Sequence, residues 1–255
     1  MLEALIFDVD GTLADTERDG HRLAFNRAFQ SFGLDWSWDV ALYGEILHVT
    51  GGKERMRHYV QTHRPGFASS DLDALILALH RQKTQYYTEH LARGGIPMRP
   101  GVKRLLQEAR AAGVRLAIAT TTTPDNVSAL LRSSLDPSAE GWFEVIGAGD
   151  VVAEKKPAPD IYRWVLARLG LPAHRCLALE DSENGLRASR QAGIPTVVTI
   201  SDYTHDQDFS GAVAVLTDLG DPGEPMTRLD GTDFSGEYVD LAVLRRWHEA
   251  VGAAG

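Results

Sequence analysis

Residues 5–16 read LIFDVDGTLADT, an apolar run that ends in two aspartates, Asp8 and Asp10, directly before Gly11. The run predicts a buried strand, and side chains two positions apart along a strand share a face. If the strand stays extended, the two carboxylates lie close together and repel each other. A shared proton, a metal ion or a separating turn at Gly11 would each relieve that repulsion. The stretch therefore predicts a strand whose carboxyl end carries acid chemistry.

Apolar runs of this kind alternate along the chain with segments of helical period. Further strands are expected at residues 114–121, 144–148, 175–181 and 195–200. Helices are expected between them, each ending in a glycine that favours a helix stop, at residues 102–113, 158–170 and 183–193. The alternation predicts an α/β fold, a Rossmann-like parallel sheet, and the nearly all-apolar strands predict helices on both of its faces.

The alternation is interrupted between about residues 15 and 98, where only helical patterns recur. An inserted helical segment explains this best, with linkers near residues 14–17 and 94–100. We therefore expect two domains, an all-α cap over residues 15–98 and a core formed by residues 1–14 and 99–255.

The segment 201–236 is rich in Asp, Gly and Pro and carries little periodicity. It is expected to be an irregular connection before a final helix at residues 238–251. No role for this segment follows from its sequence.

The composition is that of an ordinary globular protein of 255 residues with a formal net charge of −9. That charge argues against general affinity for nucleic acid or an anionic membrane, because both need positive potential. The single cysteine, Cys176, excludes an internal disulfide. No basic leader precedes an apolar core and no stretch reaches the length of a membrane span. We expect a cytoplasmic protein, or one of the plastid stroma if a targeting segment has been removed.

Ligands of an open parallel sheet bind at the carboxyl ends of its strands, and four polar groups lie at such ends. They are Asp8 with Asp10, residues 120–123, Lys155 with Lys156, and Glu180 with Asp181. Three carboxylates at one edge, Asp8, Glu180 and Asp181, call for a hard cation, and Mg²⁺ fits best. Some of these residues could instead have a purely structural role. Asp10 with Gly11 could form a turn. Asp181 with Ser182 could cap a helix, and so could Thr123 before Pro124.

The motifs DVDGT, ATTTT, KKP and LEDS, in this order and each at a strand end, resemble those of the haloacid dehalogenase superfamily. The resemblance covers residues 1 to about 200 and includes the helical cap. It implies a phosphatase that works through an aspartyl-phosphate. The implied catalytic residues are Asp8 as nucleophile, Asp10 as general acid and base, and Thr120 and Lys156 as phosphoryl contacts. The implied Mg²⁺ ligands are Asp8, the backbone carbonyl of Asp10, and Asp181, with Glu180 close to the ion or in its coordination shell.

A basic stretch in the cap, TGGKERMRHYVQTHR at residues 50–64, contrasts with the acidic chain as a whole. Gly51 and Gly52 before a helical run would present free amides to an anion, and Lys53 and Arg57 share one helix face. We expect this patch to hold a second, non-reacting anionic group of the substrate. The alternative is an ordinary solvated basic face.

Within the superfamily, the cap is similar to that of the CbbY-type phosphatases, which are encoded with carbon-fixation genes. The stretches that carry this similarity are DTERDGHRLAFNRAF at 15–29, TGGKERM at 50–56 and ATTTTPDNV at 119–127. The similarity implies hydrolysis of xylulose 1,5-bisphosphate, an inhibitor of Rubisco in the Calvin cycle. The substrate contacts expected on this basis are Glu17, His21, Thr50, Gly51, Gly52, Lys53, Arg57, Thr121 and Thr122.

Three other functions are compatible with parts of this pattern. A phosphosugar mutase of the β-phosphoglucomutase group would share the core and the cap but return the phosphate to the sugar. A dehalogenase would use Asp8 without Mg²⁺, and Asp10 together with the Glu180–Asp181 pair argues against it. A binding protein with an inactive site would need neither a nucleophile nor an acid. The expected partner is a small phosphosugar. We also expect the protein to be a monomer.

Overall fold

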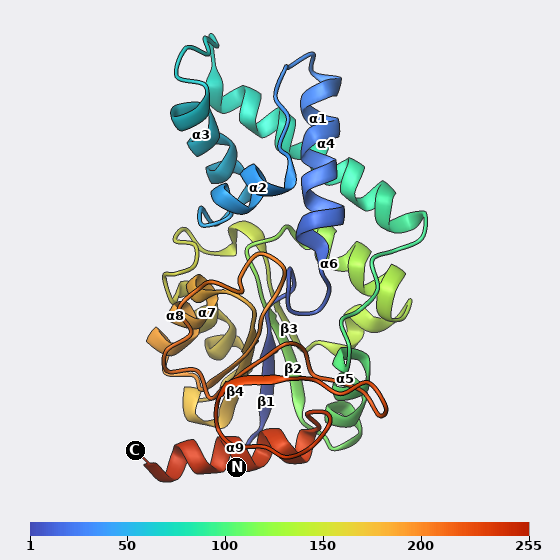
Figure 1. Cartoon of the computed structure of the whole chain (residues 1–255), viewed down its shortest axis with the longest axis vertical. Coiled ribbons are helices and arrows are strands. Elements are labelled where there is room, and N and C mark those ends of the chain that lie inside the picture. The colour runs from blue at the N-terminus through green and yellow to red at the C-terminus, as the bar shows by residue number, and fades with distance from the viewer. Residues whose placement is uncertain (255) are drawn as a thin grey trace.

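The computed structural model describes residues 1–254 and contains one seven-stranded sheet in the order β3-β2-β1-β4-β5-β6-β7 (Figure 1). All neighbouring strands are parallel except β6 and β7, which are antiparallel. The strands are β1 (Ala4–Phe7), β2 (Arg115–Ala119), β3 (Val145–Gly147), β4 (Cys176–Glu180), β5 (Thr196–Thr199), β6 (Ala214–Leu216) and β7 (Arg228–Gly231). The predicted α/β fold with a parallel sheet is confirmed.

Helices cover both faces of the sheet, because successive residues of the central strands are apolar on opposite sides. Leu5 and Phe7 of β1 pack with α5 (Val102–Ala111), α6 (Pro124–Leu130) and α9 (Leu241–Ala254). Ala4 and Ile6 pack on the other face with α7 (Asp160–Leu169) and α8 (Glu183–Gln191). The all-apolar strand sequences follow from this double coverage.

The central position of β1 explains why the polar groups meet. Phe7, its last residue, pairs with Ile118 of β2 and Leu179 of β4. The residues that follow these three, including Asp8, Thr120 and Asp181, therefore emerge side by side at the same edge. The register of three neighbouring strands thus builds one site from distant parts of the sequence.

The expectation of an irregular segment at residues 201–236 was wrong in part, since β6 and β7 lie within it. Both strands have only three or four residues, too few to show periodicity, and all of β7 is exposed. The final helix also begins at Leu241, later than expected. β7 is an edge strand without an apolar face and so leaves no pattern in the sequence, whereas β6 is buried and apolar but only three residues long.

The cap contains four α-helices above the core (Figure 1). They are α1 (Arg22–Ser31), α2 (Val40–Ile46), α3 (Gly52–His63) and α4 (Leu72–Ala92), with a π-helical turn over Glu17–His21 before α1. An aromatic cluster that includes Phe25, Trp38 and Tyr43 fills the space between these helices. The cap therefore has its own hydrophobic core, and α2 is the cap helix that the sequence did not predict.

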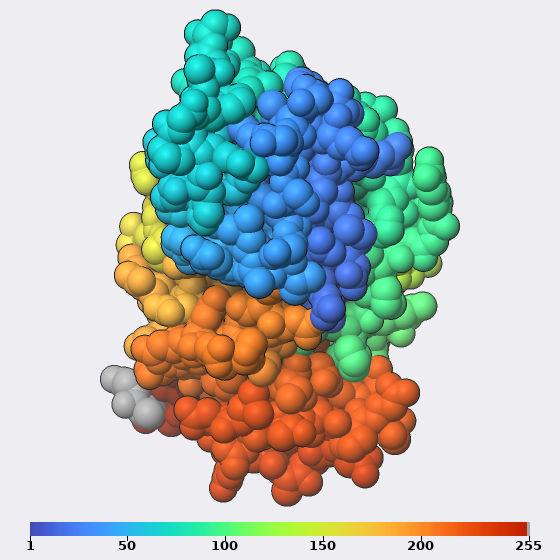
Figure 2. Space-filling model, turned by 45° about the horizontal axis from the view of Figure 1, so that its top comes forward, coloured from blue at the N-terminus to red at the C-terminus, as the bar shows by residue number. Residues whose placement is uncertain are grey.

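The two linkers run side by side at the joint between cap and core. Ala14 forms a β-bridge with Met98, and the amide of Arg99 donates to the carbonyl of Leu13 at 2.9 Å. The space-filling view shows the cap seated directly on the core (Figure 2). We therefore propose that the boundaries between the cap and the core lie at residues 15 and 98. None of the helices within residues 1–254 is long and apolar enough to cross a bilayer.

Candidate active site

Lys156 lies between two of the predicted carboxylates at the edge of the sheet. Its Nζ donates to Oδ1 of Asp8 at 2.8 Å and to Oε1 of Glu180 at 2.6 Å. All three side chains are buried, and the two carboxylates raise the pKa of Lys156 above its usual value despite its burial. Lys156 therefore stays charged and fixes the orientation of Asp8.

Glu180 faces the interior and does not line the cavity described below. It is fully buried, and its Oε1 also accepts a hydrogen bond from Tyr162. A Cβ at Gly185 would stand 1.9 Å from Oε2 of Glu180, so only glycine fits there. The geometry makes Glu180 an anchor for Lys156 at the floor of the site.

Asp181 approaches Asp8 from β4 and completes a group of three buried carboxylates. One oxygen from each of Asp8, Glu180 and Asp181 lies within 4.8 Å of the others. Oδ2 of Asp181 accepts from Ser201 at 2.9 Å, and a Cβ at Gly11 would meet the same oxygen at 2.1 Å. Gly11 also has a φ of +83°, so both its backbone and its lack of a side chain serve this approach.

Burial raises the pKa of Asp181 well above its usual range and that of Asp8 to about 7, even though Lys156 opposes the shift of Asp8. The raised pKa values of these two neighbouring carboxylates indicate that the charge of Lys156 alone does not balance them in their ionised forms. Hard oxygen donors in such a group suit Mg²⁺.

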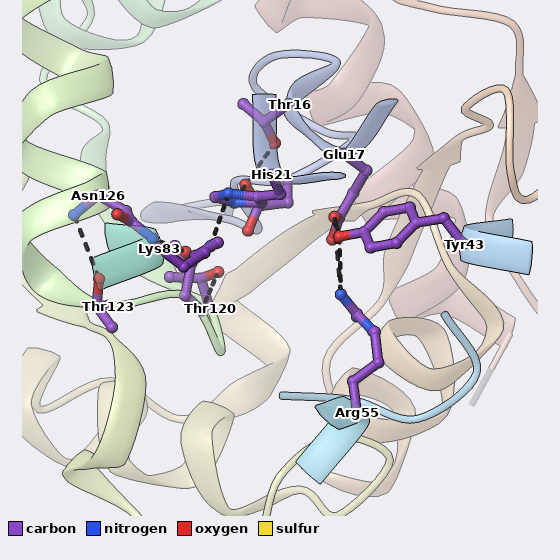
Figure 3. A network of polar contacts seen from close by, with 11 residues as sticks. Thr16, Glu17, His21, Tyr43, Arg55, Lys83, Thr120, Thr123 and Asn126 are labelled. Carbon is purple, nitrogen blue, oxygen red and sulfur yellow. Dashed lines mark hydrogen bonds and ion pairs between the residues drawn. The ribbon is translucent and has the colours of Figure 1, made fainter. Parts of the chain in front are cut away.

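Asp10 turns away from this acidic group and faces the cap, because β1 ends at Phe7 and the chain turns at Gly11. Its Oδ1 accepts from Thr16 and lies 2.9 Å from Nε2 of His21. Figure 3 labels Thr16 and His21, which lie next to each other. Burial acts to raise the pKa of Asp10, but the contacts with His21 and Thr16 lower it below its usual range. The repulsion expected between Asp8 and Asp10 is thus relieved by giving each carboxylate a different partner.

The threonine run lies where β2 ends, as expected. Thr120 is buried, and its Oγ1 accepts from the amide of Thr122 at 3.3 Å. Thr123 caps α6 by accepting from the amide of Asn126 at 3.4 Å (Figure 3), while Nδ2 of Asn126 donates to Thr122 at 2.9 Å. Thr120 and Thr121 line the cavity, whereas Thr122 is tied to α6.

A cavity of about 400 Å³ lies between the cap and this edge of the sheet. Asp8, Lys156 and Asp181 line it from the core, and Glu17 and Arg55 line it from the cap. Its volume suits a ligand of a few hundred daltons, in the usual range for small-molecule sites.

Glu17 and Arg55 are joined by a third cap residue, Tyr43. The Tyr43 hydroxyl donates to Glu17 at 2.5 Å and accepts from Nη1 of Arg55 at 2.9 Å, as Figure 3 shows. Arg55 is 6% exposed, and Nη1 lies 3.9 Å from the Glu17 carboxylate. A buried guanidinium beside a carboxylate can bind an anionic group and a hydroxyl of the same ligand.

Of the seven predicted cap contacts, five line a pocket and two do not. Glu17 and Thr50 line the cavity, and His21, Gly51 and Gly52 line a smaller polar pocket that adjoins it. Lys53 lines neither pocket and is paired with Asp150 of the core at 2.6 Å. Arg57 points away and is paired with Asp73 at 2.6 Å.

The sequence did not predict two buried basic residues of the site, Arg55 and Lys83, although its pattern carries a signal for each. Arg55 and Tyr59 are four positions apart on the buried face of α3, and Lys83 and Tyr87 are likewise on the buried face of α4. A charged residue in a buried stripe needs a polar partner inside the protein. For Lys83 that partner is Nδ1 of His21, at 2.9 Å.

The parallel sheet, the helical cap and the group of Asp8, Thr120, Lys156 and Asp181 at one sheet edge together define a hydrolase fold with a polar site under its cap. A family model described as haloacid dehalogenase-like hydrolase matches residues 2–193. The chain belongs to this family, and its relatives identify it as a phosphatase that acts on phosphorylated sugars.

The similar proteins agree on the subgroup. The protein CbbY of Cupriavidus necator is 52% identical over 97% of each chain. A phosphorylated carbohydrates phosphatase of Thermotoga maritima is 31% identical over 84% of this chain and 94% of its own. The crystal structure of CbbY from Rhodobacter sphaeroides with phosphate is 47% identical, with a TM-score of 0.80 over 86% of this chain and 95% of that one. This chain is therefore of the CbbY type.

Proposed function

We propose that this phosphatase hydrolyses a sugar bisphosphate, most simply xylulose 1,5-bisphosphate to xylulose 5-phosphate, and so removes an inhibitor of Rubisco. The observation that carries the proposal is the presence of two buried cations at one cavity, Lys156 from the core and Arg55 from the cap. A sugar with phosphates at both ends can engage both. A mutant of the Rhodobacter sphaeroides CbbY was crystallised with xylulose-1,5-bisphosphate, and 47% identity relates it to this chain.

The nucleophile in this proposal is Asp8. Lys156 engages its Oδ1, and none of the described residues donates a hydrogen bond to Oδ2. Attack of Oδ2 on phosphorus forms an aspartyl-phosphate and expels the sugar oxygen. Lys156 and Thr120 then contact the phosphoryl oxygens, and water hydrolyses the intermediate.

Magnesium, which the family implies, fits the residues present. Asp8 and Asp181 would hold it with the backbone carbonyl of Asp10, while Lys156 and Tyr162 hold Glu180 close by. The fit rests on the raised pKa values of Asp8 and Asp181, because a nearby cation would restore their ionised forms. When bound, Mg²⁺ would neutralise the charge of the transferring phosphoryl group.

Proton transfer in this proposal belongs to Asp10. Its lowered pKa leaves it ionised before substrate binds. A phosphate dianion placed beside Asp8 adds negative charge and so raises the pKa of Asp10, which lets it take up a proton and give it to the leaving oxygen. The resulting carboxylate then accepts a proton from the attacking water.

The other end of the sugar would meet the cap. Arg55 is placed to bind the second phosphate, and Glu17 to accept hydrogen bonds from sugar hydroxyls. Lys53 and Arg57, the contacts favoured by the sequence, are engaged by Asp150 and Asp73. We therefore propose Arg55 as the main contact of the non-reacting phosphate.

Phosphate release tests this function directly. The purified protein is assayed with and without Mg²⁺ on xylulose 1,5-bisphosphate, xylulose 5-phosphate and β-glucose 1-phosphate. We expect Mg²⁺-dependent release of one phosphate per bisphosphate, with the highest kcat/KM for that substrate. Conversion of β-glucose 1-phosphate without phosphate release would identify a mutase instead, and preference for a monophosphate would contradict the bisphosphate assignment.

A further inference from the structure

The segment of residues 201–207, which follows β5, forms one wall of the active-site cavity. Ser201, Tyr203, Thr204 and Gln207 all line the cavity. The family model ends at residue 193, and the sequence assigned this segment no role. The segment therefore contributes to the cavity from outside the part of the chain that the family model matches.

The segment is fixed to the core at both ends. At its far end Gln207 accepts from the Glu183 amide, at the start of α8, at 2.7 Å, and within the segment the Ser201 amide donates to Oγ1 of Thr204 at 2.8 Å. The Ser201 hydroxyl also donates to Asp181. These bonds make the segment a rigid extension of the site that holds the reacting phosphate.

Tyr203 crosses from this segment to the cap. Its ring lies edge-on to that of Tyr43, with centroids 5.9 Å apart at 71°. It also covers Gly44 of α2, where an added Cβ would stand 3.0 Å from Cδ1 of Tyr203. Gly44 is not among the glycines with positive φ, so its backbone does not require glycine. A Cβ at this position would instead press on the Tyr203 ring, which would have to move by a few tenths of an ångström.

Tyr43 is the residue that holds Glu17 and Arg55 in place. A shift of Tyr43 would move both groups relative to Asp8 and Lys156. Tyr203 thus links the fixed core to the part of the cap that faces the sugar.

We propose that Tyr203 is a positioning residue that sets substrate selectivity, by fixing the distance between the phosphoryl site of the core and the Glu17–Arg55 pair of the cap. The proposal rests on the proposed function, because it takes Glu17 and Arg55 as contacts of the non-reacting end of the sugar. A substrate without a sugar, such as p-nitrophenyl phosphate, offers the Glu17–Arg55 pair neither hydroxyls nor a second phosphate, so its turnover should depend less on Tyr203.

The test compares Tyr203→Ala, Tyr203→Phe and Gly44→Ala on xylulose 1,5-bisphosphate, xylulose 5-phosphate and p-nitrophenyl phosphate. We expect Tyr203→Ala to raise KM for the bisphosphate by about tenfold, as small misplacements of binding groups do, with little change for p-nitrophenyl phosphate. Gly44→Ala should act in the same direction although alanine favours a helix over glycine. Tyr203→Phe keeps the ring and should resemble the wild type.

Tyr238→Ala serves as the matched control, since Tyr238 is also half-buried but packs on Arg104, away from the cavity. Equal losses on all three substrates in Tyr203→Ala, or an unchanged KM in both Tyr203→Ala and Gly44→Ala, would overturn the proposal. If the wild type prefers xylulose 5-phosphate, the bisphosphate assignment fails. The Tyr203 effect is then measured on that monophosphate, where a selective rise in KM still supports the positioning role.

Discussion

The ammonium of Lys83 lies 2.9 Å from Nδ1 of His21. An ammonium can only donate, so Nδ1 of His21 accepts from Lys83, and Nε2 on the other side of the ring is the atom that faces Asp10. Lys83 stands on α4 of the cap and Asp10 belongs to the core. The orientation of the proposed general acid therefore depends on a lysine of the cap.

Lys83 should give the protein a pH-dependent stability. Burial lowers its pKa to about 8, although Asp10 and Glu17 oppose the shift. Between pH 8 and about 10.5 the unfolded chain binds the proton more tightly, so wild-type stability rises with pH across this window. The rise should reach about 3 kcal/mol relative to Lys83→Met. Urea unfolding at pH 7.5, 9 and 10.5 measures it, and parallel pH profiles for the two proteins would contradict it.

Asp8→Asn should abolish turnover and leave the fold intact. Loss of a nucleophile costs about 10⁴-fold or more in kcat, while the amide keeps the shape of the side chain. Phosphate release and circular dichroism measure the two effects, with Asp202→Asn, an exposed residue, as the control. Substantial residual turnover would show that Asp8 does not attack phosphorus.

Asp10→Asn should lower kcat strongly but retain Mg²⁺ affinity. Only the backbone carbonyl of Asp10 is proposed as a ligand, and its side chain faces Thr16 and His21. The loss in kcat should be about 10²- to 10⁴-fold, as for other general acids and bases. Calorimetric titration with Mg²⁺ gives the affinity. A parallel loss of binding would make the side chain a ligand.

The motifs at the ends of β1, β2 and β4 could be predicted because these strands are buried on both faces, so apolar runs and their polar ends both stand out in the sequence. Asp8 and Asp181 belong to this class. The strand ends alone do not show which way a side chain turns, and the opposite orientations of Asp8 and Asp10 follow from the turn at Gly11 and from partners in the cap.

The cap was harder to predict in detail. Helical spacing placed Lys53 and Arg57 on one face, but it does not tell which face points to the cavity. The aromatic packing around Tyr43 decides this, and it turns Arg55 inward. Likewise α2, with seven residues and Gly44 inside it, is too short for a periodic signal.

Mg²⁺ should stabilise the wild type but not Asp181→Ala. Binding to the folded state alone adds about 2.7 kcal/mol at a concentration of 100 times Kd, and removal of Asp181 takes away one proposed ligand. Thermal unfolding with Mg²⁺ or with EDTA measures the shift, and Asp218→Ala provides a control outside the carboxylate group. Equal shifts in the wild type and in Asp181→Ala would place the ion elsewhere.

Arg55→Met and Arg57→Met separate the two possible phosphate contacts on α3. Arg55→Met should raise KM for the bisphosphate by about 10- to 100-fold, because a buried charged hydrogen bond is lost. Arg57→Met should leave KM within about twofold, since Arg57 forms an exposed pair with Asp73. The reverse order of effects would restore Arg57 as the contact.

Lys53 joins the cap to the core through Asp150, and a double-mutant cycle can show whether this is its role. Asp150 also accepts from Lys155 at 2.8 Å, and the hydrogen bonds from Lys155 and Lys53 lower the pKa of Asp150 to about 2. The Asp150 side chain is 65% exposed, so the pair should be worth no more than about 1 kcal/mol.

If Lys53 acts through Asp150, Lys53→Met and Asp150→Asn should each raise KM for the bisphosphate by about two- to fivefold, the range that such a pair allows. The double variant should be no worse than either single one, because both remove the same interaction. Their effect should shrink as salt rises from 0.05 to about 0.5 M, since exposed pairs are screened.

A direct contact between Lys53 and the substrate predicts a different result: Asp150→Asn would free the ammonium and lower KM, while Lys53→Met would raise it. Steady-state kinetics of the four proteins at the two salt concentrations distinguish these outcomes.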